Sequence, residues 1–233
     1  MPIRKNVVFL LMVLGGLLFA WFINNDRLMG AANTNGQYLV QAIDISQGRL
    51  AIRYERGPIF PLLLAGAFYI GKDVLVSAFW VTQFIFFVSI LLTVYLTNML
   101  YGKRVALISA IFLYSSKLIF ELNWMFGLRF LVVSFLLASC ILFVTACKSS
   151  RKWVFHLSGV ALGLAILTKE TGFFYFYFPF LFLLIPNFRK KKILYGIGQF
   201  YIGLFLVALL WGGVLLYADQ TLLKFFGAMS PSR

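Results

Sequence analysis

Seven long runs of apolar residues dominate this sequence and restrict the folds open to it. They cover residues 7–23, 74–100, 105–120, 130–147, 153–168, 173–186 and 193–217. A helix of about 20 apolar residues crosses the hydrocarbon core of a bilayer, and only helices or closed barrels satisfy their backbone there. Charged residues make up 12% of the chain, about half of what a soluble domain carries. The sequence therefore predicts an all-α integral membrane protein with about seven transmembrane helices.

Four basic clusters indicate how the chain is threaded. They lie at residues 4–5, 103–104, 148–152 and 189–192. The apolar run at 58–70 is too short to span, and if it stays on one side all four clusters share a face, which the positive-inside rule makes cytoplasmic. The run at 7–23 lacks a small-x-small cleavage site and is typical of an uncleaved signal-anchor. We expect one transmembrane domain over residues 1–233 of a cell (inner or plasma) membrane protein, with a cytoplasmic amino terminus. An extracytoplasmic loop is expected at 24–73, six further spans between 74 and 217, and an extracytoplasmic tail at 218–233.

The net charge of +14 follows largely from this topology. In a soluble chain such an excess would indicate nucleic-acid binding, but here it gathers in the cytoplasmic turns. The acidic residues all fall at the outer ends of spans or in outside loops: Asp26, Asp44, Glu55, Asp73, Glu121, Glu170 and Asp219. Two interpretations stay open. The acids either avoid neutralising the inside clusters, or they form a polar, carboxylate-bearing cavity at the outer face.

The loop at 24–73 is predicted to carry two juxtamembrane helices. Residues 38–50 form an amphipathic pattern in which Leu39, Ala42 and Ile43 share one face and Gln41 and Asp44 point away. Such a helix lies in the plane of the membrane surface. A second, short helix is expected at 58–70.

Arginines gather between these two helices. Arg49, Arg53 and Arg56 lie within eight residues of one another, with Glu55 among them. Arginine binds phosphate through paired hydrogen bonds, although interfacial arginines also snorkel towards anionic lipid. A lipid phosphate is one interpretation of this loop and snorkelling is the other.

The remaining features are less specific. No phosphate-binding loop, dinucleotide fingerprint, metalloprotease motif or hydrolase elbow occurs in the sequence. Cys140, Cys147 and His156 are interpreted as packing or interface residues, and the spacing of Gly159 and Gly163 is interpreted as a helix-packing signal. We expect no metal ligands and no cofactor, although a divalent metal stays open.

Four short motifs carry a resemblance to a known class. They are Tyr38-x-x-x-Ala42 with Gly48; Tyr54-Glu55-Arg56-Gly57-Pro58; Tyr101-Gly102-Lys103-Arg104-x-Ala106-Leu107; and Gly159-x-x-x-Gly163-Leu164-Ala165-x-Leu167-Thr168-Lys169-Glu170. In their order and spacing the chain resembles the GT-C class of membrane glycosyltransferases, in the group of protein O-mannosyltransferases and lipid A aminoarabinose transferases. The resemblance covers nearly the whole chain.

The resemblance implies a hexosyl or pentosyl transferase with a polyprenyl-phosphate sugar donor. Its acceptor is a lipid, a glycan or a protein, and the reaction occurs at the extracytoplasmic face. A first-loop carboxylate acts as the base, which makes Glu55 the first candidate, with Asp44 and Asp26 as substitutes. The residues implied to bind the donor phosphate are Arg56, Arg53, Lys169 and Arg129. Tyr38, Glu121 and Glu170 complete the polar site.

The chain departs from the family pattern at two acidic positions. Many relatives carry an Asp-Glu pair where Thr34 and Asn35 stand here, and Gly127 and Arg129 occupy positions where an acid is expected. The chain also resembles the amino-terminal half of such an enzyme. The alternative is therefore an inactive or truncated relative that binds the lipid donor or serves as a subunit of a membrane complex. A small transporter is disfavoured, because the ionisable residues collect at the outer ends and not at the membrane midplane.

Overall fold

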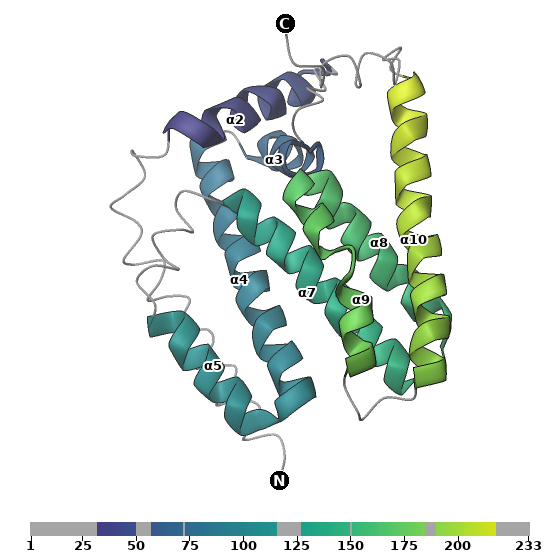
Figure 1. The fold of residues 1–233 in the computed structure, drawn as a ribbon. Coiled ribbons are helices and arrows are strands. Elements are labelled where there is room, and N and C mark those ends of the chain that lie inside the picture. Colours follow the sequence, from purple (N-terminus) through teal and green to yellow (C-terminus); the bar gives the residue numbers. More distant parts are fainter. Residues whose placement is uncertain are drawn as a thin grey trace, which may run out of the picture. The chain divides into compact units, whose positions relative to one another are not determined.

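The computed structural model describes residues 32–49, 57–71, 73–115, 127–149, 151–184 and 190–217, and these residues form helices joined by short turns (Figure 1). The elements are α2 (Ala32–Ser46), α3 (Ile59–Ile70), α4 (Val74–Tyr101), α5 (Lys103–Ser115), α7 (Gly127–Lys148), α8 (Trp153–Thr168), η2 (Glu170–Tyr175), α9 (Phe178–Leu181), η3 (Phe182–Leu184) and α10 (Lys190–Tyr217). The predicted all-α fold class is confirmed. The expected span at 7–23 lies outside the described residues.

Three described helices are long and apolar enough to cross a membrane. They contain Val74–Tyr101, Gly127–Lys148 and Lys191–Val214, and Ile59–Ile70 and Trp153–Thr168 are shorter apolar helices. The long helices coincide with three of the runs expected to span. Helix α5 covers the first part of the run at 105–120, and the rest of that run lies outside the described residues.

The chain forms two compact units. The first comprises Met1–Ala51 and Phe60–Ser134, and the second comprises Ile52–Ile59 and Phe135–Arg233. Helix α7 contributes its first turns to unit one and the remainder to unit two. Gly57 and Pro58, which precede α3, belong to unit two.

In unit one, α4 and α5 form a hairpin around an apolar core. Gly102 joins the helices with a φ of 87°, a left-handed conformation that glycine adopts without steric strain. The core of the hairpin consists of Phe86, Ile90, Val94, Ala106 and Ala110. Asp73 begins α4, because its carboxylate accepts hydrogen bonds from the Leu75 and Val76 amides at 2.8 and 3.0 Å.

The first turns of α7 pack against α4 through one polar and one aromatic contact. The Ser89 and Ser134 hydroxyls lie 2.6 Å apart, and Ser89 also donates to the Phe130 carbonyl at 2.9 Å. The Phe86 and Phe130 rings meet edge to face at 5.0 Å. Each buried hydroxyl therefore has a partner, as buried polar groups require.

Helix α2 buries a different face from the one predicted. Tyr38, Gln41 and Ala42 are buried, and Gln41 is only 1% exposed. The predicted exposure of Gln41 is wrong. The Tyr38 ring packs edge to face on Phe60 at 5.8 Å, and residues three and four positions after Tyr38 lie on the same helix face. The contact with Phe60 therefore turns Gln41 inwards, whereas the sequence pattern had pointed to Leu39 and Ile43.

In unit two, α8 and α10 run parallel and approach closely through glycines. A Cβ placed at Gly159 would overlap the Phe200 carbonyl, and one at Gly163 would lie 2.7 Å from Val207. From the other side, a Cβ at Gly203 would overlap the His156 carbonyl. This confirms Gly159 and Gly163 as packing residues, because small side chains let helix backbones approach each other.

Helix α7 packs on α8 through a reciprocal pair of serines. Ser139 donates to the Ser158 carbonyl at 2.6 Å, and Ser158 donates to the Ser139 carbonyl at 2.7 Å. Further along, the Phe143 and Phe155 rings meet at 5.3 Å. Because Ser139 pairs with Ser158 and Phe143 with Phe155, α7 runs antiparallel to α8.

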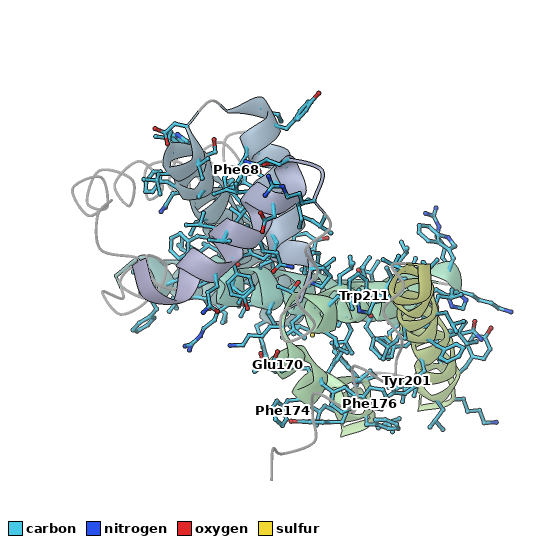
Figure 2. All side chains as sticks on the ribbon, turned by 90° about the horizontal axis from the view of Figure 1, so that it is seen from above. Phe68, Glu170, Phe174, Phe176, Tyr201 and Trp211 are labelled. Carbon is cyan, nitrogen blue, oxygen red and sulfur yellow. The ribbon has the colours of Figure 1, made fainter. Side chains whose placement is uncertain are left out.

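The run expected to span at 173–186 is not one α-helix in its described part. After α8 the chain turns back through η2, α9 and η3. The ring centres of Phe176 and Tyr201 lie 4.6 Å apart (Figure 2). Those of Phe182 and Phe143 lie 5.1 Å apart. The segment therefore returns along the helices of its own unit. Two physical reasons account for the broken helix: Pro179 lacks an amide donor, and a 3₁₀ turn rises about 2.0 Å per residue, so fewer residues cover the distance.

A methyl group at Gly159 is expected to disturb the α8–α10 contact. Gly159→Ala should destabilise the fold by about 1–3 kcal/mol, because the added carbon forces the backbones apart. Thermal unfolding in detergent micelles measures the effect as a lower Tm. Gly213→Ala, on α10 with no atom within 4 Å of the added carbon, is the matched control. Equal Tm values for the two variants would contradict the packing role.

Candidate functional site

Five of the residues predicted for the site lie among the described residues. Asp26, Arg53, Glu55, Arg56 and Glu121 lie outside them. Tyr38, Asp44 and Arg129 belong to unit one, and Lys169 and Glu170 belong to unit two. The described site is therefore built from the end of α8 in unit two.

Helix α8 ends at a buried threonine followed by a charged pair. Thr168 is fully buried, and its hydroxyl donates to the Leu164 carbonyl at 2.7 Å. Lys169 leaves the helix with φ −159° and ψ 139°, while its amide still donates to the Ala165 carbonyl at 3.1 Å. Glu170 then begins η2. The change of backbone direction at Lys169 thus places an ammonium and a carboxylate on adjacent residues at the helix end.

The backbones of two glycines lie against the last turn of α8. A Cβ at Gly172 would lie 2.8 Å from the Ala165 carbonyl carbon, and one at Gly57 would overlap the carbonyls of Leu167 and Thr168. Only a residue without a side chain fits either place. The approach of Gly57 brings one residue of the Tyr54–Pro58 motif onto the last turn of α8, which is directly followed by Lys169 and Glu170.

The electrostatics of this helix end favour a cation. The last carbonyls of a helix lack partners within the helix and carry a partial negative charge. The Lys169 ammonium complements that charge, and Lys169 is half-buried whereas Glu170, labelled in Figure 2, is exposed. Within the described part of the chain, neither side chain forms an ion pair. A lysine in this state binds phosphate through a charge-assisted hydrogen bond.

The site residues of unit one have different surroundings. The Tyr38 ring is buried against Phe60 and contributes to the packing of α2 on α3. Asp44 is half-buried on α2, and Arg129 is exposed in the first turn of α7. Among the described residues, no group of three or more His, Cys, Asp or Glu could hold a metal ion.

Sequence reasoning noticed both motifs at the end of α8 but missed their contact. Gly57 was noted only as part of a motif, and a glycine directly before a proline indicates a turn but not the segment that the turn contacts. The burial of Thr168 was also missed. Its position, one residue before Lys169 at the end of an apolar run, gave no indication of which face the helix buries.

Comparison with known proteins identifies the family. Residues 55–211 match the family described as dolichyl-phosphate-mannose-protein mannosyltransferase, which is more than half of the chain. The chain belongs to this family. The match includes Glu55, Gly57 and Lys169, the residues on which the site argument depends. No curated protein and no solved structure matches the chain.

Membership of the mannosyltransferase family confirms the resemblance to the GT-C class. It implies a membrane glycosyltransferase that uses a polyprenyl-phosphate-sugar donor, with a glycan or a protein as the general class of acceptor. Together with the long apolar helices, it makes the chain a multi-pass membrane protein.

Proposed function

We propose that this protein transfers a hexose or pentose from a polyprenyl-phosphate donor to a lipid, glycan or protein acceptor at the extracytoplasmic face of the cell membrane. The observation that carries the proposal is the approach of Gly57 to the end of α8. This contact holds Gly57, which directly follows Glu55 and Arg56 in the sequence, next to Lys169. A base and a phosphate-binding cation can then act on one donor molecule.

The proposed reaction is a direct displacement. Glu55 accepts the proton of the acceptor hydroxyl, and the hydroxyl oxygen forms a bond to the anomeric carbon with inversion. The bond from that carbon to the phosphate oxygen breaks, and polyprenyl phosphate leaves with the electron pair. Its charge is stabilised by Arg56, Arg53 and Lys169, which all belong to unit two. Glu170 serves as a polar neighbour in the same unit. Asp44 and Asp26 stay sequence-based alternatives for the base, and Arg129, Tyr38 and Glu121 stay sequence-based predictions for the polar site, because all five belong to the other unit.

The proposed orientation is supported by the direction of α8 and α10. Because these helices run parallel, the basic residues at the start of each lie at the same end of unit two, and Lys169 and Glu170 lie at the other end of α8. By the positive-inside rule, we expect these basic residues to lie on the cytoplasmic side. Lys169 and Glu170 then face the outside, as does Gly57, which lies against the end of α8.

A direct assay tests the proposed activity. The purified protein in detergent, supplied with a labelled polyprenyl-phosphate sugar and a membrane extract as acceptor, is expected to transfer label to lipid, glycan or protein. Thr34 and Asn35 stand where many relatives carry an acidic pair, which favours a second candidate function: a donor-binding subunit without turnover. Saturable donor binding without transfer would support that second function and overturn the first.

Replacing Lys169 tests its role in donor binding. We expect Lys169→Gln to raise the KM for the donor about tenfold, because one charge-assisted hydrogen bond to phosphate is worth about 1.5–3 kcal/mol. The measurement is the transfer rate as a function of donor concentration. Lys103→Gln, an exposed lysine at the start of α5 in unit one, is the control. An unchanged KM in Lys169→Gln would remove Lys169 from the phosphate site.

A further inference from the structure

Within unit two, two contacts join the turn between α7 and α8 to the start of α10. The Lys192 ammonium donates a hydrogen bond to the Ser149 carbonyl. The Lys152 ammonium lies 5.4 Å from the centre of the Tyr195 ring, within range of a cation–π contact. Both contacts use lysines to join segments that are about 40 residues apart in the chain. The basic residues of the turn and of α10 are thereby held together as one surface.

This surface, which we call the basic end, contains no carboxylate among the residues that the structure describes. Its members are Lys148, Arg151, Lys152, Lys191 and Lys192. The only acidic residue between positions 135 and 217 is Glu170, which follows the far end of α8. A helix of 16 residues is about 24 Å long. At that distance Glu170 cannot form an ion pair with any lysine or arginine of the basic end.

Helices α8 and α10 both start at the basic end, and they add to its positive electrostatic potential. Lys152 precedes α8 without a side-chain cap, and the first turn of α10 contains no acidic residue. Because α8 and α10 are parallel, the positive ends of both helix dipoles lie at the basic end. Lys152, Lys191 and Lys192 therefore stand at helix starts, where acids are normally found, whereas Lys148 lies in the last turn of α7, where a basic residue is favourable. An anion bound between them would relieve this repulsion.

Exposed aromatic and apolar residues lie beside the basic end. Trp153 is 55% exposed, Tyr195 45% and Leu194 57%. Tryptophan and tyrosine next to lysines are typical of the level where lipid headgroups meet hydrocarbon. The neighbouring apolar surface distinguishes the expected ligand from a free anion, because acyl chains can lie against it.

We propose that the basic end binds the phosphate of an anionic phospholipid, and that the lipid stabilises the contact of the α7–α8 turn with α10. The ligand is a structural lipid of the surrounding membrane. It is separate from the sugar donor, whose phosphate is assigned to Lys169 at the opposite end of α8. Basic surfaces between membrane helices bind anionic headgroups through the same charge-assisted hydrogen bonds.

Lipid titration of the full chain in detergent tests the proposal. Native mass spectrometry counts bound lipid, and thermal unfolding reports stabilisation. Phosphatidylglycerol is expected to bind and raise the Tm, whereas phosphatidylcholine and inorganic phosphate are expected to leave it unchanged. The double variant Arg151→Gln/Lys191→Gln should weaken phosphatidylglycerol binding about 30-fold, since each basic residue contributes about a factor of five.

Matched variants separate this lipid from the donor and from a general effect of charge. Lys103→Gln/Arg104→Gln removes two basic residues from unit one and should keep the response to phosphatidylglycerol, as should Lys169→Gln. The charge-conserving Arg151→Lys/Lys191→Arg variant should also keep it, which excludes loss through misfolding. Equal stabilisation by phosphatidylcholine or by inorganic phosphate would overturn the proposal, and so would loss of the response in Lys169→Gln.

Discussion

Glu55→Gln is expected to lower the rate of sugar transfer by about 10²-fold or more, the lower end of what a positioned general base contributes. The amide keeps the size of the side chain but cannot accept the proton of the acceptor hydroxyl. The effect should appear in kcat, with little change in the KM for the donor, because Glu55 is not assigned to the phosphate. Initial rates with a labelled polyprenyl-phosphate sugar measure both quantities.

A second carboxylate of the same loop provides the control for this variant. Asp73→Asn makes the same change of carboxylate to amide at the residue that begins α4. Asparagine accepts hydrogen bonds at this position as aspartate does, so the amides of Leu75 and Val76 keep their partner and activity should be retained. If Glu55→Gln is fully active, the assignment of the base moves to Asp44 and Asp26, each tested by its own substitution with asparagine.

Gly57→Ala is expected to have an effect of similar size for a purely geometric reason. The added carbon would overlap the carbonyls of Leu167 and Thr168, so residue 57 must move away from the end of α8, and we expect this to displace the proposed base Glu55, two residues before it in sequence. A displacement of about 1 Å in a catalytic arrangement can cost about 10²-fold in rate. We expect kcat/KM to fall by about this factor, and both Arg56 and Lys169 to remain chemically intact.

Gly66→Ala is the matched control for the glycine variant. Gly66 lies on α3, nine residues after Gly57 in sequence, and no atom lies within 4 Å of a carbon added there. This variant should transfer sugar at the rate of the unchanged protein. Thermal unfolding of both variants separates local displacement from general loss of fold. A Gly57→Ala protein with normal kcat/KM would show that the approach to α8 does not position the site.

Much of the fold could be predicted from hydrophobicity alone. The runs at 74–100, 130–147 and 193–217 became α4, α7 and α10, because a long apolar segment has few alternatives to a helix in lipid. The short run at 58–70 became α3. Two details of the prediction were wrong, and each depends on contacts with another segment of the chain. The inward face of α2 is decided by the contact of Tyr38 with Phe60. Pro179 and the 3₁₀ turns break the helix in residues 173–184, and the rings of Phe143 and Tyr201 pack against the returning segment.

The candidate site was only half predictable. The resemblance to the glycosyltransferase class implied Glu55, Arg56 and Lys169 as site residues. The acidic residues, Glu170 among them, were also singled out because charged residues near hydrocarbon are costly and tend to be functional. Nothing in their spacing indicates that Gly57 meets the end of α8. A backbone approach of this kind depends on the shape of both partners, and a sequence motif carries no information about its distant neighbour.

The sequence by itself determined that this chain is helical, that it is apolar enough to lie in a membrane, and that it is similar to polyprenyl-phosphate glycosyltransferases. Those properties are sums over many residues or local patterns, so each can be obtained from a linear string. The tertiary structure alone decided which glycines are contacts, which face of α2 is buried and which motifs lie together. These outcomes arise from steric exclusion between segments remote in sequence: the same glycine is a loose turn or a close contact depending on the carbonyls placed opposite it.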